Sequence, residues 1–203
     1  LATRDYNDIE EMYIGAPNGA KELRTVGRSL QLGDGGTGFT VELNGFYNLM
    51  DNLGVYGNFY YLMNPREQNG TRTYRETISP NLANEAIMSV PDQYMLRAGF
   101  NCSFHYIKGL SVAAGARLEG IPVHDLVGGS GDFRRPGYIW SVEPSVNYEY
   151  KKVTLFASVP FAVVRNRTQS VTDKENSITR GIHVQGDAAF ADYTINVGIS
   201  TRF

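Results

Sequence analysis

Acid–base chemistry would have to start from the three histidines, because histidine changes charge near neutral pH. Counting along the sequence places His105 opposite Ser111, with no carboxylate positioned to orient its ring. His124 adjoins Asp125, but neighbouring side chains usually point apart, and His183 stands alone in a polar segment. We therefore expect no catalytic residues and no enzyme, and keep a hydrolase that uses His105 or His124 as a minor alternative.

A pair of opposite charges is the second candidate. A tight turn over residues 107–109 would align Tyr106 with Leu110, and counting back from it places Arg97 opposite Glu119. Inside a narrow interior, such a pair is either a charged constriction that selects solutes or a structural ion pair that fills space. The sequence leaves both interpretations open.

The remaining polar motifs predict no metal site and no cofactor. GDGGTG at 33–38 lacks the Lys and Ser/Thr of a phosphate-binding loop and is typical of a tight turn. GGSGD at 128–132 offers one carboxylate to calcium, and a flexible loop is the simpler interpretation. Arg134 and Arg135 are either solvated loop charges or contacts for phosphate groups or an anionic solute. Cys102 is the only cysteine, and the net charge of -2 gives no reason to expect nucleic acid.

Alternation with a period of two is the main structural signal of the sequence. In one segment Leu110 and Val112 fall on one face of an extended strand, while Ser111 and Gly115 fall on the other. Seven segments alternate in this way: 37–49, 53–63, 94–106, 110–120, 138–150, 153–163 and 189–203. An eighth segment around 22–32 alternates poorly. Residues 1–20 are left unassigned, and residues 21–203 are taken as one unit.

The lengths of these segments and of their connections favour a membrane barrel over a soluble β-sandwich. The segments have 11 to 15 residues, whereas strands of globular proteins average about 5 to 6 and strands that cross an outer membrane need about 9 to 11. Three connections are tight turns and three are long and polar, as in outer-membrane barrels. Aromatic residues gather near the segment ends, as interfacial girdles do. We therefore predict an all-β fold, an antiparallel transmembrane β-barrel with about eight strands in this chain.

In such a barrel the apolar face, which includes Cys102, contacts lipid and the polar face lines the lumen. The lumen-facing candidates are Glu42, Asn44, Asn58, Arg97, Asn101, His105, Arg117, Glu119, Glu143, Glu149 and Asp192. The same face also carries Phe46, Tyr56, Tyr60, Ile139 and Phe156. These apolar side chains indicate either an apolar or aromatic solute or the packing of a narrow interior.

The last segment, AFADYTINVGISTRF, resembles the closing strand of Gram-negative outer-membrane β-barrels, which typically ends in Phe. In that family the barrel assembly machinery recognises this strand. The positions that match are Tyr193, Ile195, Val197, Ile199 and Phe203, and Thr201 departs from the pattern because it is polar. The resemblance implies a bacterial outer-membrane location.

Four further stretches carry a narrower resemblance: SLQLGDGGTGFTVELN, VPDQYMLRAGFN, FRRPGYIWSVEPSVNYEY and SVPFAVVRNRTQS. They resemble a group of uncharacterised outer-membrane proteins that are labelled putative transporters or phenol-degradation meta-pathway proteins. Members of that group have further strands before this region, so the resemblance implies the C-terminal part of a barrel of about 12 strands.

The function expected from these features is passive diffusion of small solutes, including apolar or aromatic ones, through an outer-membrane barrel. Its expected partners are membrane lipid, lipopolysaccharide, the assembly machinery and the solute. The main alternative is a structural or adhesive barrel with a blocked lumen that acts through its long loops. An outer-membrane hydrolase is the weaker alternative.

Overall fold

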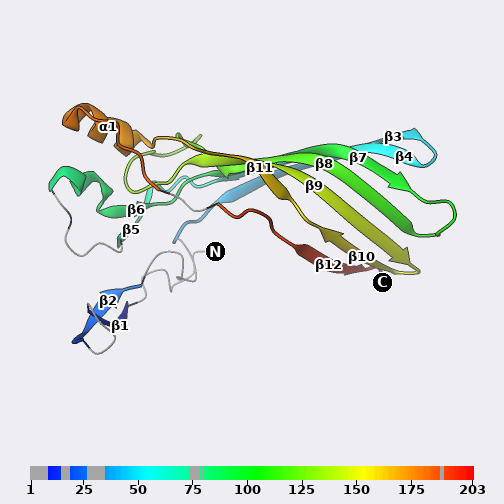
Figure 1. Cartoon of the computed structure of the whole chain (residues 1–203), viewed down its shortest axis with the longest axis horizontal. Coiled ribbons are helices and arrows are strands. Elements are labelled where there is room, and N and C mark those ends of the chain that lie inside the picture. Colours follow the sequence, from blue (N-terminus) through cyan, green and yellow to red (C-terminus); the bar gives the residue numbers. More distant parts are fainter. Residues whose placement is uncertain (1–8, 15–18, 27–34, 74–77, 79, 188–189) are drawn as a thin grey trace.

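One curled antiparallel sheet dominates the structure of the chain, a computed structural model that describes residues 9–14, 19–26, 35–73, 78, 80–187 and 190–203 (Figure 1). The strands of this sheet are β3 (Phe39–Met50), β4 (Leu53–Met63), β7 (Gln93–Ser103), β8 (Leu110–Ile121), β9 (Gly137–Tyr150), β10 (Val153–Ser158), β11 (Phe161–Arg167) and β12 (Asn196–Thr201). Their order is β12-β10-β9-β8-β7-β4-β3, and β11 continues the line of β10 beside β9. The chain is therefore mostly antiparallel β, as expected.

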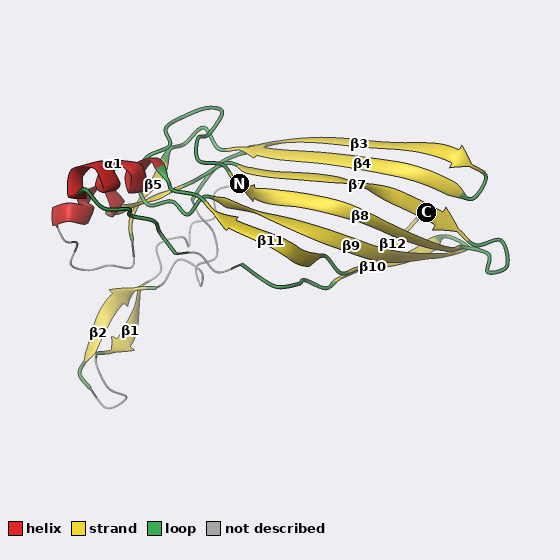
Figure 2. Ribbon diagram, turned by 45° about the horizontal axis from the view of Figure 1, so that its top comes forward, coloured by secondary structure: helices red, strands yellow, loops and turns green. Residues whose placement is uncertain are grey.

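The sheet curls into a half-barrel toward one of its faces (Figure 2). Phe46 of β3 and Phe156 of β10 lie near opposite ends of the strand order, yet their side chains line the same cavity. Only curling toward the face that bears both side chains brings them together. We call this face the concave face and the other the convex face.

The convex face is apolar and exposed. Its strand positions in β3, β4, β7, β8, β9, β10 and β12 carry no charged residue. Leu43, Leu96, Val142 and Ile199 on this face are 64%, 46%, 50% and 66% exposed. A soluble sandwich would bury such a face against a second sheet. In the described part of the chain, however, the buried hydrophobic residues are only Val26, Met88 and Val90.

Pro160 divides the sixth line of the sheet into β10 and β11. Proline has no N–H to donate to a neighbouring strand, and a register irregularity follows it between Ala162 and Val164. The predicted strand 153–163 is therefore interrupted, and its second part extends to Arg167.

The final strand is shorter than predicted. Regular pairing with β10 covers only Asn196–Thr201, and Tyr193 makes an isolated bridge to Phe161. Upstream of β12, the Thr194 amide donates to the Pro160 carbonyl at 3.3 Å, beside the interruption. The segment 190–195 therefore follows an irregular path along β11.

The prediction of a strand over 22–32 beside the others is wrong for residues 22–25. These residues belong to β2 (Lys21–Thr25), which pairs with β1 (Ile9–Tyr13) in a separate two-stranded sheet. The two strands, IEEMY and KELRT, carry charged residues on both faces, and Lys21 of β2 pairs with Glu11 of β1. This small sheet therefore lacks the apolar face that the large sheet has. Residues 27–32 lie outside the described residues.

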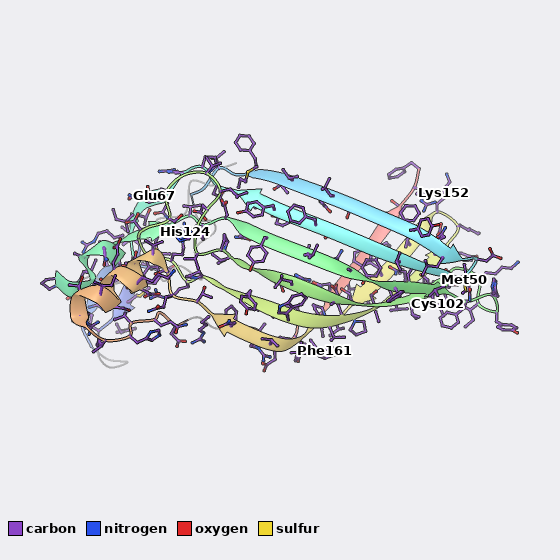
Figure 3. All side chains as sticks on the ribbon, turned by 90° about the horizontal axis from the view of Figure 1, so that it is seen from above. Met50, Glu67, Cys102, His124, Lys152 and Phe161 are labelled. Atoms are coloured by element: carbon purple, nitrogen blue, oxygen red, sulfur yellow. The ribbon has the colours of Figure 1, made fainter. Side chains whose placement is uncertain are left out.

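The long connections at one end of the sheet contain structure of their own. They hold β5 (Gln68–Arg72), a 3-10 segment (Pro80–Glu85), β6 (Ile87–Ser89) and α1 (Val171–Arg180). Helix α1 begins with a capping box between Ser170 and Asp173 and ends at Arg180, where Gly181 caps it with a φ of 64°. Figure 3 shows Glu67 and His124 at this loop end and Met50, Cys102 and Lys152 at the tight-turn end. No helix among the described residues is both long and apolar enough to cross a membrane.

Candidate functional site

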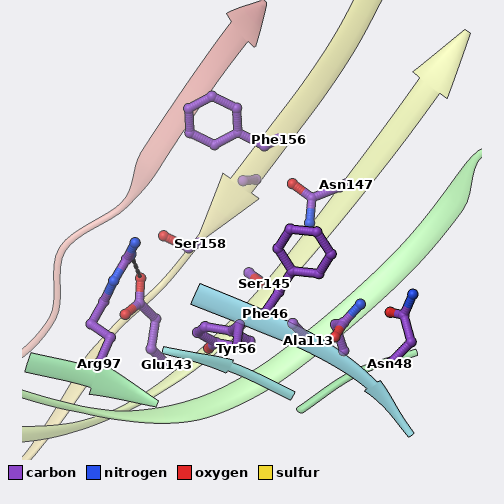
Figure 4. A pocket seen from close by; sticks show the side chains of 12 residues that line it. Phe46, Asn48, Tyr56, Arg97, Ala113, Glu143, Ser145, Asn147, Phe156 and Ser158 are labelled. Carbon is purple, nitrogen blue, oxygen red and sulfur yellow. Dashed lines mark hydrogen bonds and ion pairs between the residues drawn. The ribbon is translucent and has the colours of Figure 1, made fainter. Parts of the chain in front are cut away.

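The concave face holds a groove of about 390 Å³ between the middle of the sheet and its tight-turn end (Figure 4). Ligand sites in proteins have volumes of roughly 300 to 1,000 Å³. Strands β3, β4, β7, β8, β9 and β10 all contribute side chains to it. The side chains used below are Phe46, Asn48, Tyr56, Arg97, Asn101, Glu143, Ser145, Asn147, Phe156 and Ser158.

Counting outward from the tight turns at 50–52 and 151–152, as from the turn at 107–109, predicts two further registers that shape this groove, and both are confirmed. In β3 and β4, Asn44 faces Asn58 and Phe46 faces Tyr56, with an irregularity only at the turn. In β9 and β10, Asn147 faces Phe156. Both pairs of strands are joined by tight turns, so counting outward from the turn gives the correct register.

The register predicted for β7 and β8 is wrong by two residues. Arg97 faces Arg117, and Glu119 faces Met95. The ladder stops at Ser103, and residues 104–109 form a wider connection than the predicted turn. Because side chains alternate with a period of two, this shift leaves every residue on its predicted face.

The facing pair Arg97 and Arg117 places two like charges side by side, which is unfavourable unless each finds a carboxylate. Arg97 Nη1 lies 3.2 Å from Glu143 Oε1 on β9, and Arg117 pairs with Glu119 on its own strand. The Glu143 side chain is 4% exposed and that of Arg97 is 34% exposed. Arg97 therefore pairs with Glu143, not with Glu119 as predicted.

Two facing glycines make room for an aromatic side chain on the floor of the groove. Gly99 faces Gly115, and a Cβ atom at either position would lie within 2.8 Å of the Tyr56 hydroxyl oxygen. Tyr56 itself faces Gly99 from β4. The phenol therefore lies across two strands and approaches the Arg97–Glu143 pair.

A second polar cluster adjoins the groove on β3 and β4. The amide of Asn58 donates to Glu42 Oε1 at 3.2 Å and to Asn44 Oδ1 at 2.5 Å, and Asn44 donates to Glu42 at 3.0 Å. Asn58 is buried, and its own Oδ1 has no hydrogen-bond partner. Glu143 is buried as well, and its Oε2 has none. Each residue thus keeps a free acceptor.

The remaining lumen-facing candidates lie apart from this cluster. Asn101 lines the groove. Glu149 is near the tight-turn end, where its Oε1 lies 3.5 Å from Arg202 Nη1. Asp192 precedes β12 and forms an exposed ion pair with Arg165. His105 lies in the connection after β7, outside every strand.

None of the three histidines has an acid–base partner in the described residues. His105 and His124 are exposed, and Ser111 faces Ser103 rather than His105. His183 Nε2 lies 3.1 Å from the side-chain oxygen of Gln185. No hydrogen bond or ion pair in the described chain joins a histidine to a carboxylate.

The neighbour of His124, Asp125, belongs instead to a buried polar cluster at the loop end. Arg134 Nη1 donates to Asp125 Oδ1 at 2.9 Å, and both side chains are 0% exposed. Arg134 Nη2 also donates to Ser89 Oγ at 2.9 Å. The Asp92 carboxylate accepts a hydrogen bond from the Tyr61 hydroxyl at 2.9 Å, and the Asp92 backbone N–H donates one to the Asp125 carboxylate. The cluster ties β4 and two long loops together.

Both loop interpretations are therefore wrong for Arg134, and for Arg135, whose side chain is 20% exposed, they stay a prediction. Arg134 is neither solvated nor available to an anion, because Asp125 and Ser89 surround it. Arg135 packs over the Phe133 ring at 4.0 Å and lies 3.8 Å from Glu85. Both arginines hold loops to one another.

The glycine-rich segment 128–132 is in contact with other loops. The Asp132 carbonyl accepts a hydrogen bond from Thr172 at the start of α1. Burial, and then the nearby Glu67, raise the pKa of the Asp132 carboxyl, and Arg134 opposes this effect. No cluster of metal-ligating residues occurs in the described part of the chain.

Four polar groove residues were missing from the sequence-based candidates: Asn48, Ser145, Asn147 and Ser158. They lie on the predicted lumen face, at even-numbered steps from residues already placed there. The period of two was therefore a sufficient signal for all four.

No protein-family model, curated protein or solved structure matches this chain.

Proposed function

We propose that the curled sheet is part of the wall of a transmembrane β-barrel in the bacterial outer membrane, and that small solutes cross by passive diffusion along its concave face. The observation that carries this proposal is the difference between the two faces. The convex face exposes apolar side chains without a charge on its strands, as contact with lipid requires. The concave face carries charged groups, amides and hydroxyls around a groove.

The strand lengths support the same proposal. β3 and β8 have 12 residues each and β9 has 14, whereas crossing the apolar layer takes about 9 to 11. The tight turns gather at one end of these strands and the structured loops at the other (Figures 1 and 3). In the proposed orientation the loops face the outside of the cell.

The open sheet also bears on the proposal, because backbone groups in lipid must be paired. β3 and β12 each have only one strand neighbour among the described residues. Further strands between them would complete a barrel, in line with the expected total of about 12. β12 carries Val197 and Ile199, which we propose the assembly machinery recognises together with Tyr193, Ile195 and Phe203.

The test is the electrical conductance of the purified full chain in a planar lipid bilayer. Discrete single-channel steps would support solute passage. A chain that inserts into vesicles but stays silent would overturn it. A chain that is soluble and monomeric without detergent would overturn the membrane proposal as a whole.

One observation favours the second candidate, a structural or adhesive barrel. The loops are organised around the buried pair of Arg134 and Asp125, and such fixed loops could present a surface to a partner. A silent barrel whose loops bind cells or surfaces would favour this function. Neither proposal involves a reaction or a cofactor.

A further inference from the structure

We infer that the concave groove is a binding site for an uncharged, hydroxyl-rich solute with an apolar face, such as a mono- or disaccharide. This inference rests on the proposed function, since it names the class of solute that would use the concave face. It is carried by three properties of the groove: its charge balance, its free hydrogen-bonding groups and its aromatic side chains.

The charge balance of the groove favours an uncharged solute. Among the described residues, Arg97 and Glu143 are the only charged side chains that line it, and their charged atoms lie 3.2 Å apart, so the groove has no net charge. A charged solute must give up water when it enters. In this groove it would meet one positive and one negative side chain side by side, so that attraction to one is offset by repulsion from the other. A neutral solute bears no such cost.

The groove also contains hydrogen-bonding side chains that are free to bind a solute. The side chains of Asn48, Asn101, Ser145 and Asn147 make no hydrogen bond within the described chain. Asn48 and Asn101 lie on either side of Gly54, close enough that a Cβ atom there would contact both side-chain oxygens. Amides and hydroxyls gathered in this way offer donors and acceptors to several hydroxyl groups at once.

The aromatic side chains supply surfaces for an apolar face. Phe46 projects from β3 and is 82% exposed, Phe156 comes from β10, and Tyr56 lies on the glycine floor between them. A sugar ring has hydroxyls around its rim and C–H groups on its faces, so it matches rings and amides together. A purely apolar or aromatic solute would cover the rings but leave the amides without partners, which is unfavourable.

The experiment measures binding to the full chain folded in zwitterionic micelles, since sugar-headed detergents would compete. Saturation-transfer NMR and calorimetry are run with glucose and maltose as probes. Gluconate, glucosamine and benzyl alcohol serve as anionic, cationic and aromatic comparators. We expect the neutral sugars to bind, the ring C–H protons to receive the strongest transfer, and the comparators to bind at least tenfold more weakly.

Single substitutions test whether the sugar binds in the groove. Because one hydrogen bond contributes about 0.5 to 1.5 kcal/mol, Asn147→Ala and Asn101→Ala should each weaken sugar binding roughly two- to tenfold. Phe46→Ala should reduce the transfer to the C–H protons. Asn166→Ala, which removes an exposed amide on β11 outside the groove, should change nothing, and circular dichroism checks that each variant is folded.

The outcomes separate this inference from the proposed function. A channel that conducts but binds no sugar would overturn the inference and leave the function standing. A chain that binds sugar but is silent in bilayers would overturn the proposed function and leave the inference standing. Binding of benzyl alcohol or of either charged sugar as tight as that of glucose, or equal binding by all variants, would overturn the inference.

Discussion

Arg97 and Glu143 form an ion pair that crosses an intervening strand. They lie on β7 and β9, with β8 between them, and their charged atoms are 3.2 Å apart. The residue of β8 that faces Glu143 is Gly115. Because glycine has no side chain, nothing rises from β8 at that point to separate the two charges.

Removing the arginine should destabilise the fold because it leaves a buried carboxylate without its partner. We expect Arg97→Ala to lower the free energy of unfolding by about 2 kcal/mol, below the range for a fully buried pair because Arg97 is partly exposed. Urea unfolding in vesicles measures this. The double variant Arg97→Ala/Glu143→Ala should recover part of the loss. Arg202→Ala, which breaks an exposed pair with Glu149, should cost less than about 0.5 kcal/mol.

A methyl group at Gly115 should displace the Tyr56 ring. Its Cβ would lie 2.5 Å from the Tyr56 hydroxyl and 2.5 Å from the Ala98 carbonyl oxygen. We expect Gly115→Ala to lower the free energy of unfolding by about 1 to 3 kcal/mol, as overpacking does. Gly45→Ala is the matched control, because nothing lies within 4 Å of its Cβ. Equal effects at both glycines would contradict the packing of Tyr56 described above.

Neighbouring positions on β3 distinguish a face in lipid from a face in water. Leu43 is on the convex face and Asn44 on the concave face, and both are exposed. In a bilayer, Leu43→Arg should cost about 2 to 4 kcal/mol, while Asn44→Arg should cost much less. Vesicle-based unfolding compares the two. If both substitutions were equally tolerated, the convex face would not contact lipid.

The buried pair at the loop end should control loop order rather than sheet order. Arg134→Met leaves Asp125 buried without its partner, so we expect a loss of about 3 kcal/mol, close to the usual cost of breaking a buried pair. Limited proteolysis should then cleave the loops, while the far-ultraviolet spectrum of the strands persists. Arg180→Ala, at the exposed end of α1, is the control and should leave cleavage unchanged. Resistance of the Arg134 variant would disprove the role of the cluster.

Asp132 should make stability depend on pH in the acidic range. Burial and Glu67 raise its pKa in the folded chain above the ordinary value of 3.8. The folded state therefore binds the proton more tightly, and the resulting stabilisation is complete below the ordinary pKa and is lost as pH rises through the raised one. Unfolding between about pH 3 and pH 7 should show this decline. Asp132→Asn should abolish it, and Asn tolerates the φ of 62° at this position.

The sequence was sufficient for the strands and their faces but not for every register. Tight turns fixed the pairing of β3 with β4 and of β9 with β10. The six-residue connection after Ser103 did not, because Phe104, two residues before the predicted Tyr106, closes it against Leu110. That two-residue shift moved Arg97 away from Glu119. Its true partner, Glu143, lies on β9, two strands away, and local sequence spacing gives no sign of such a pair.

The loop end was harder to predict for a different reason. Asp125 and Arg134 both lie in the connection between β8 and β9, and they meet because it folds back on itself and against Ser89 of another loop, which alternation cannot describe. Helix α1 did leave a signal, because Ser170 and Asp173 have the spacing of a capping box. The polar composition of that segment obscured it. The break at Pro160 could likewise be anticipated from the missing N–H of proline.

The order of strands has a consequence for assembly. The sheet contains seven lines, counting β10 and β11 as one, so its edge strands β3 and β12 run in the same direction. Two copies in the same orientation, joined β12 to β3, would therefore meet through parallel seams. Closure with antiparallel pairing throughout needs an odd number of additional strands between β12 and β3. Antiparallel closure thus excludes a barrel built only from copies of this sheet in one orientation.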